Sequence, residues 1–251
     1  MLGILGFTAG FIDAVVGGGG LIQLPALLIN LPKTNLATIF GTNKIAALAG
    51  TSIAAYQYSK RITFNWWLLL VTSFCAGAAS FGGAKIVSLL NSASLKPFML
   101  LVLIVIAVYT IFKKDLGNAT TKTLSINKQL LHGIWIGLLV GFYDGFFGPG
   151  TGSFLVLGFV IVLGFDFIKA SAYAKVVNCM TNIGALVVFI KDGHYILEIA
   201  VLLAACNIFG NIVGSKMAIK KGNGFVRLVF LCIVVLMILR YGFDVYKHYS
   251  L

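Results

Sequence analysis

Two lysines lie inside long apolar segments, where a charged side chain needs a reason. Lys44 and Lys175 each stand about eight residues from the start of their segment, hence about 12 Å deep in a helix. A lysine at the centre of a bilayer costs on the order of 3 kcal/mol, and such charges commonly mark a substrate path. The pair predicts cationic groups that face a cavity and bind an anion. In the structural alternative, each lysine is neutralised by Asp13 or Asp144 of its own half of the chain, or reaches the membrane interface.

The same half of the chain supplies an aspartate and a glycine run upstream of each lysine. Asp13 precedes residues 17–20, which are all glycine, and Asp144 precedes Gly-Pro-Gly-Thr at 148–151. Glycines leave backbone N–H groups uncovered, and each run precedes a short apolar segment. If that segment is helical, its N-terminus is an anion site. The aspartates either pair with the lysines or take up protons that couple transport to a gradient.

Polar side chains accompany both lysines along one helical face. Lys175, Asn178 and Asn182 follow a spacing of three and four residues, and Lys44 has Thr51 on the same face. Amide and hydroxyl groups beside a cation suit an oxyanion, although such stripes also hold helices together. The candidate substrate-binding residues are Lys44, Lys175, Asn43, Thr51, Asn178, Asn182, Gly17, Gly18, Gly19, Gly20, Gly148, Gly150 and Thr151.

The elements that carry these residues occur twice. An offset of 131 residues, with no gap, relates many like residues of the two halves. The pairs are Gly6 with Gly137, Asp13 with Asp144, Lys44 with Lys175, Lys60 with Lys191, Gly83 with Gly214, Lys85 with Lys216 and Lys96 with Arg227. A constant spacing indicates a duplicated unit, which is typical of membrane transporters.

Each repeat contains about five apolar segments. In the first half they cover roughly 1–16, 21–31, 36–58, 65–90 and 95–112, and in the second roughly 130–147, 151–164, 167–190, 194–218 and 225–246. We therefore expect a first transmembrane repeat at 1–112, a polar linker at 113–129 and a second repeat at 130–251. The second segment of each repeat is too short to cross a hydrocarbon core of about 30 Å. It predicts a discontinuous or re-entrant helix after the glycine run.

The composition predicts an all-α integral membrane protein. The chain is 59% hydrophobic and 10% charged, against about 25% charged in soluble domains. The net charge of +12 comes from lysines and arginines scattered between apolar segments, so it indicates topology signals and no nucleic-acid partner. The cysteines and histidines show no ligand spacing, and we expect neither a metal site nor a cofactor.

The basic residues also bear on orientation. If all ten segments cross the membrane, one side is more basic than the other. That side carries Lys60, Arg61, the linker lysines and the basic group at 216–227. This favours inverted repeats, with the linker in the cytoplasm and both termini outside the cell membrane. Lys85 and Lys216, each in a Gly-x-Lys at a segment end, are expected to reach towards the interface.

Several stretches resemble one known family. They are the glycine run with the proline that follows it (17–25), Gly-Thr-Asn-Lys at 41–44, Lys-Arg-Ile at 60–62, and residues 141–154 and 170–178. Across the whole chain the sequence resembles the TauE/SafE sulfite exporters, also called four-toluene-sulfonate uptake permeases, and within them the bacterial subset of membrane transporters. The resemblance implies transport of small sulfur-containing anions such as sulfite, sulfonates or sulfoacetate.

The function predicted from the sequence is secondary transport of a small anion by alternating access, with the substrate and the lipid bilayer as partners. We expect no enzyme, but one alternative is an intramembrane enzyme with Asp13 and Asp144 as acid and base. An anion channel and a membrane scaffold without transport are further alternatives. Whether the chain forms a homodimer is left open.

Overall fold

The computed structural model describes residues 2–90 and 124–249, and every regular element among them is an α-helix. The predicted segment 95–112 lies outside the described residues. In chain order the helices are α1 (Leu2–Val16), α2 (Gly20–Asn30), α3 (Leu36–Ser59), α4 (Trp66–Leu89), α6 (Ile126–Phe146), α7 (Thr151–Ile161), α8 (Phe167–Lys191) and α9 (Leu197–Tyr249). The all-helical fold predicted from the sequence is confirmed for these residues.

Local sequence sets where the long helices begin. The side chains of Asn35, Asn65 and Asp166 accept hydrogen bonds from the first backbone N–H groups of α3, α4 and α8, as good helix caps do. A glycine interrupts the longest helix: Gly222 in α9 has the non-helical angles φ 76° and ψ −169°. The predicted segments 194–218 and 225–246 are therefore the two arms of α9.

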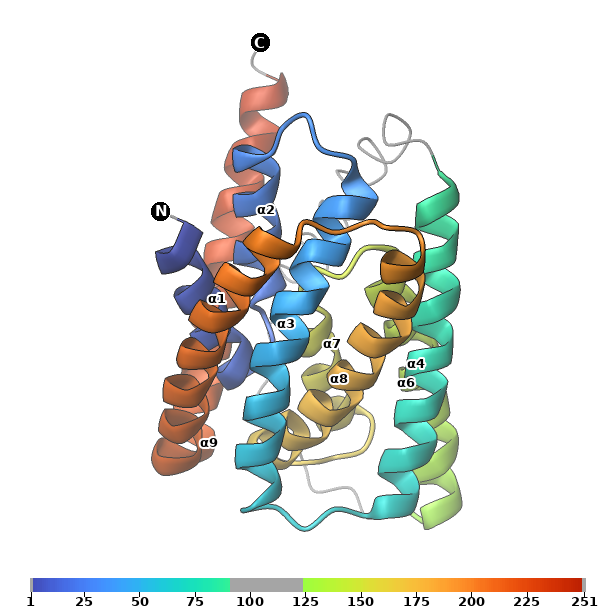
Figure 1. Cartoon of the computed structure of the whole chain (residues 1–251). Helices are drawn as coiled ribbons and strands as arrows, with labels where there is room; N and C mark the ends of the chain where they lie inside the picture. The colour runs from blue at the N-terminus through green and yellow to red at the C-terminus, as the bar shows by residue number, and fades with distance from the viewer. Residues whose placement is uncertain (1, 91–123, 250–251) are drawn as a thin grey trace.

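The path of the chain alternates in direction (Figure 1). There α3 descends and α4 returns upward, whereas α8 rises and the first arm of α9 descends to Gly222. The short helices α2 and α7 lie inside the bundle, and each follows its glycine run directly, as predicted.

The halves pack on each other through equivalent contacts. A Cβ at Gly10 of α1 would collide with the backbone of Asn207 in α9, and a Cβ at Gly141 of α6 would collide with that of Ala76 in α4. The offset of 131 residues converts the first contact into the second. Small residues let helix backbones approach this closely. Each first helix thus packs against the fourth segment of the other half.

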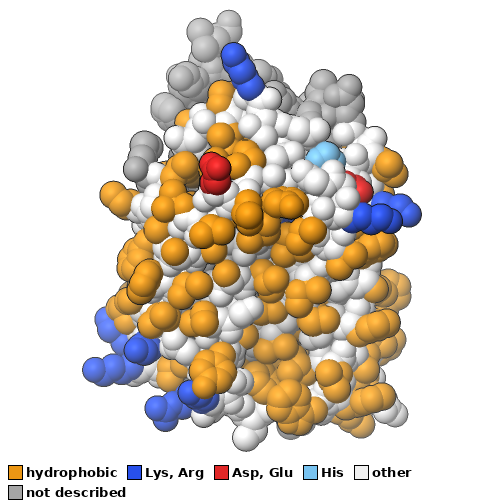
Figure 2. Space-filling view, viewed as in Figure 1, with side chains coloured by type: hydrophobic (Ala, Val, Ile, Leu, Met, Phe, Trp, Pro, Cys, Tyr) orange, Lys and Arg blue, Asp and Glu red, His pale blue; other side chains and the backbone are white. Residues whose placement is uncertain are grey.

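The outer surface is suited to lipid. Among the described residues, the stretches Trp66–Leu89, Phe167–Lys191 and Leu197–Val226 are long and apolar enough to cross a membrane. In the face shown in Figure 2, hydrophobic side chains cover the middle, while lysines and arginines gather towards the lower and upper margins. This distribution matches an integral membrane protein.

Candidate functional site

The two buried lysines bind aspartates of the opposite half. Lys44 Nζ lies 2.7 Å from Asp144 Oδ2, and Lys175 Nζ lies 3.2 Å from Asp13 Oδ2. The alternative that paired each lysine within its own half is therefore wrong about the partners. Each lysine pairs with the aspartate of the other half because α1, which carries Asp13, and α6, which carries Asp144, each pack into the other half.

The first cluster gathers around Asp13 near the end of α1. Thr51 of α3 donates its hydroxyl to Asp13 Oδ2 at 2.9 Å, and Lys175 also donates to the backbone carbonyl of Asp13. Three helices, α1, α3 and α8, thus converge on one carboxylate. Lys175 is 1% exposed, so its charge depends on these contacts.

The second cluster is related to the first by the same offset. Besides its bond to Asp144, Lys44 donates to Asn182 Oδ1 at 3.3 Å. Asn182 is the offset partner of Thr51, so a polar group from the third helix of a repeat completes each cluster. The buried Asn182 Nδ2 has no hydrogen-bond partner among residues 2–90 and 124–249. This amide is available to a ligand next to the Lys44 ammonium.

Each cluster is neutral as it stands. A buried ion pair gains Coulomb energy but loses hydration, so its net contribution is small, whereas removing one partner costs about 3–5 kcal/mol. An anion that reaches either lysine must compete with the aspartate already there. The arrangement can exchange one carboxylate for another oxyanion on the same ammonium group.

The two glycine runs touch each other between the clusters. A Cβ at Gly17, which has φ 80°, would collide with the backbone of Gly152. Ser153 donates its backbone N–H to Gly17 O at 3.1 Å and its hydroxyl to Val16 O at 3.0 Å. The contact joins the end of α1 to the start of α7. Glycine is needed at Gly17 both for its positive φ and for this approach.

The glycine run before α2 keeps free donors. Among the described residues, the backbone N–H groups of Gly18 and Gly19 have no hydrogen-bond partner. Gly19 lies against Asp13, since a Cβ there would meet the aspartate side chain at 2.7 Å. Uncovered amides at the N-terminus of α2, beside a lysine-bound carboxylate, are donors for an anion.

The other predicted residues lie near the clusters, and Gly148 belongs to the second one, since a Cβ there would lie 3.4 Å from Asp144 Oδ1 and 3.8 Å from Lys44 Nζ. Asn43 precedes Lys44 in α3 and is buried, and no described residue forms a hydrogen bond with its Oδ1. Asn178 accepts from Thr181 on its own helix, and Thr151 donates to Gly148 O. The residues Gly20, Gly148 and Gly150 complete the two glycine runs.

Sequence reasoning missed a second polar group. Gln23 of α2, with Asn207 and Asn211 of α9, is buried and hydrogen-bonded. The spacing of four residues between the two asparagines, in an otherwise apolar helix, is the signal that would have found them. Among the described residues no cluster of histidine, cysteine or acidic side chains could hold a metal ion.

Comparison with known proteins gives a single answer. The family model described as "Sulfite exporter TauE/SafE" matches residues 2–241. The "Probable membrane transporter protein" of Haemophilus influenzae is 34% identical over 96% of this chain and 92% of its own length. The "Probable membrane transporter protein ORF9" of a Sinorhizobium species is 35% identical over 94% and 89%, and YfcA of Escherichia coli K12, with the same description, is 31% identical over 97% and 90%. No solved structure matches the chain.

Proposed function

The chain belongs to the TauE/SafE sulfite exporter family, and from this premise we propose that it is a secondary transporter for a small sulfur-containing oxyanion. Its named relatives are membrane transporters, and the chain is accordingly a membrane protein. The substrate, the mechanism and the location in the cell membrane are the proposal. The family description favours sulfite, and the two buried lysines suit sulfite and sulfonates alike.

The observation that carries the proposal is that each buried lysine forms an ion pair with the aspartate of the other half. Lys44–Asp144 and Lys175–Asp13 are buried, neutral and adjacent to glycine runs. We propose that the substrate oxyanion displaces one carboxylate from its lysine. The displaced aspartate then takes up a proton, because an unpaired carboxylate in this position would be costly.

Donors around each lysine suit the oxygens of such a substrate. Thr51 accompanies Lys175, and the free amide of Asn182 accompanies Lys44. The unpaired N–H groups of Gly18 and Gly19 lie beside Asp13. A sulfite or sulfonate group has three oxygens and needs several donors in addition to one cation, because a charge removed from water requires both.

We propose alternating access between two inverted repeats. The opposite directions of α3 and α8 in Figure 1 support the inversion, as does the recurrence of the Gly10–Asn207 contact as Gly141–Ala76. In this mechanism the ion pairs between the halves hold the two halves together. When the substrate displaces Asp144 or Asp13 from its lysine, one half is free to move relative to the other. Substrate binding energy thereby changes the equilibrium between the two states.

Purified protein in liposomes tests the function. Uptake of ³⁵S-sulfite is measured for the wild type, Lys44→Ala and Lys175→Ala, with Lys85→Ala as the matched control at a segment end. We expect saturable uptake that accelerates when unlabelled sulfite is trapped inside, and its loss in both central variants but not in the control. Flux without saturation would favour a channel, and chemical conversion of the substrate would favour an enzyme. Normal uptake by both central variants would contradict the proposal.

A further inference from the structure

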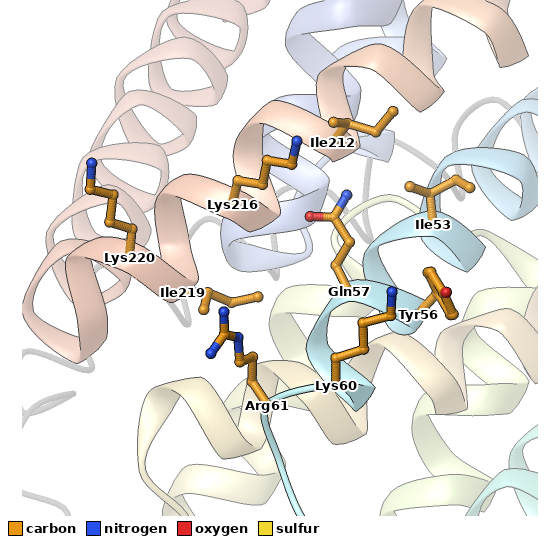
Figure 3. A pocket seen from close by; sticks show the side chains of 9 residues that line it. All are labelled: Ile53, Tyr56, Gln57, Lys60, Arg61, Ile212, Lys216, Ile219 and Lys220. Carbon is orange, nitrogen blue, oxygen red and sulfur yellow. The ribbon is translucent and has the colours of Figure 1, made fainter.

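A basic cleft opens between the end of α3 and the middle of α9 (Figure 3). Its volume is about 830 Å³, and Lys60 and Arg61 line it from the α3 side while Lys216 and Lys220 line it from α9. Gln57 lies between the two groups of cations. All four cationic residues line this one concave space, although the Lys220 side chain points away from Gln57 in Figure 3.

The positive charge of this cleft is not neutralised by the described part of the protein. Of the described residues, those that line the cleft include no aspartate or glutamate. Lys60 lies over the Tyr56 ring at 4.1 Å, and no described aspartate or glutamate forms an ion pair with the four cations. A concave surface with charges of one sign raises the local concentration of counter-ions. The cleft is therefore suited to collecting anions.

A ladder of polar side chains leads from the cleft into the core. Gln57 Oε1 lies 2.9 Å from the hydroxyl of Ser215, which lies 2.5 Å from the carbonyl of Asn211. Asn211 donates to Asn207 Oδ1 at 2.8 Å, and Asn207 donates to Gln23 Oε1 at 2.7 Å. Ser215, Asn211 and Asn207 follow one another at intervals of four residues along one face of α9. The ladder is thus continuous from the cleft to the short helix α2.

The ladder has unused hydrogen-bonding groups in its interior. Gln23 is 2% and Asn211 0% exposed, yet Gln23 Nε2 and Asn211 Oδ1 have no hydrogen-bond partner in the described part of the chain. A ladder that served only to join helices would gain by satisfying every buried group. Unpaired groups in a row can instead bind a solute, or the water that accompanies it, as it passes.

The inner end of the ladder lies beside the Asp13 cluster. A Cβ at Gly50 of α3 would strike the amide groups of both Asn207 and Asn211. The next residue in the chain is Thr51, which donates to Asp13. Gly50 therefore allows the ladder to approach the ion pair of Lys175 and Asp13.

Among the described residues, the opposite end of the molecule keeps only two of the four cations and one polar side chain of the ladder. The offset of 131 residues converts the five ladder residues Gln23, Gln57, Asn207, Asn211 and Ser215 into Phe154, Val188, Ala76, Ser80 and Ala84. It converts the cleft cations Lys60, Arg61, Lys216 and Lys220 into Lys191, Asp192, Lys85 and Leu89. The duplicated scaffold has thus acquired cleft and ladder on one side only.

We propose that the cleft is an anion vestibule and that the ladder connects it to the Lys175–Asp13 pair. This inference rests on the proposed function and adds the side on which the oxyanion is collected, which is the side of Lys60 and Lys216. The topology expected from the sequence makes that side cytoplasmic. The ligand is a small oxyanion attracted by lysine and arginine and then transferred to amide and hydroxyl donors.

Sided vesicles test the vestibule. Initial rates of ³⁵S-sulfite flux are measured in inverted and right-side-out membrane vesicles for Lys216→Gln/Lys220→Gln and for the control Lys85→Gln/Lys191→Gln. We expect the cleft variant to raise the half-saturating concentration about threefold to tenfold in inverted vesicles only, with a weaker dependence on salt. Equal effects on both sides, or none with wild-type flux intact, would overturn the proposal.

A second measurement tests the electrostatic preference of the cleft without relying on transport. Failure of the vestibule proposal is thereby distinguished from failure of the proposed function. A cysteine replaces Ile219 on the cleft wall, and its modification by an anionic and a cationic thiol reagent is compared in neutral phosphatidylcholine liposomes. We expect the anionic reagent to be favoured, and Lys216→Gln/Lys220→Gln to reduce that preference severalfold. An unchanged preference would overturn the vestibule even if sulfite is not transported. Loss of the preference only when anionic lipid is present would assign the cleft to lipid headgroups and likewise overturn it.

The ladder has its own test. Asn211→Leu keeps the approximate volume and removes the amide. Asn30→Leu is the matched control outside the ladder, because the Asn30 amide likewise donates to the carbonyl four residues earlier in its own helix. We expect Asn211→Leu to reduce the sulfite flux of the folded protein about tenfold or more, whereas the loss of its hydrogen bond to Asn207 Oδ1 lowers the unfolding temperature only modestly. A variant that unfolds early but transports normally when folded would show that the ladder is structural.

Discussion

Lys44 and Asp144 lie 2.7 Å apart across the boundary between the two halves of the chain, and so join α3 to the end of α6. The offset pair Lys175 and Asp13 makes the equivalent connection between α8 and the end of α1. The two bonds hold the halves together at the residues that we assign to the substrate. In the proposed mechanism, substrate binding and the movement of the halves are therefore coupled through the same atoms.

The first prediction concerns the stability of this connection. Lys44→Met leaves the Asp144 carboxylate buried without its cation, and we expect a loss of about 3–5 kcal/mol in the free energy of unfolding. Adding Asp144→Leu should restore most of that loss, since the double variant buries no charge. Thermal unfolding in detergent, compared across the two single variants and the double variant, measures the coupling. Additive losses would show that the pair is not a unit.

The second prediction concerns pH. If release of an aspartate from its lysine requires a proton, the rate of uptake rises as the pH on the donor side falls. An alkylsulfonate, whose charge is constant over the range tested, isolates the protein's contribution. We expect Asp13→Asn and Asp144→Asn to flatten the pH profile, because an amide needs no proton to leave the lysine. A profile as steep as that of the wild type in both variants would assign the proton to another group.

The third prediction uses the contact between α3 and α8. Ser52 Oγ lies 3.7 Å from Cys179 Sγ, so the thiol of Ser52→Cys would stand within reach of Cys179. Mild oxidation should form a disulfide that stops transport, and reduction should restore it, if these helices separate during the cycle. Ser52→Cys/Cys179→Ala is the control for oxidation at other sites. Full transport by the cross-linked protein would show that α3 and α8 move together.

The fourth prediction concerns the contact between the glycine runs. Gly17→Ala introduces a Cβ at φ 80° and drives it into the backbone of Gly152. We expect a lower unfolding temperature and loss of sulfite binding, because a left-handed conformation alone costs about 1–2 kcal/mol. Gly82→Ala, in the helix α4 with nothing within 4 Å, is the control. It should be neutral or stabilising by up to about 1 kcal/mol, and equal behaviour of the two variants would contradict the role of the contact.

Much of the fold follows from local sequence. The positions of α2 and α7 could be predicted because glycine runs and length define them. The aspartate partner of each lysine could not be predicted, because the repeat offset is equally consistent with pairing within a half and pairing between halves. Close packing of Gly10 on Asn207 decides it. That packing depends on how the halves interlock, a long-range property.

The cleft and ladder were missed for a related reason. A search guided by repeats finds residues that occur twice, such as Asp13 and Asp144, whereas Asn207 and Asn211 correspond to Ala76 and Ser80. The sequence alone predicts that Lys216 reaches towards the interface, because its neighbours across the cleft are distant in the chain. Features that break the duplication are visible only once both halves are in place.

The most direct test of the central claim is the affinity of the purified protein for sulfite when the competing carboxylate is removed. The account predicts that Asp144→Asn binds sulfite more tightly than the wild type, by about tenfold if the lost competition is worth about 1.4 kcal/mol, and that Lys44→Met in the same background abolishes the gain. Equilibrium binding of ³⁵S-sulfite in detergent measures both. Weaker or unchanged binding by a folded Asp144→Asn protein would contradict the claim that substrate and aspartate share one lysine.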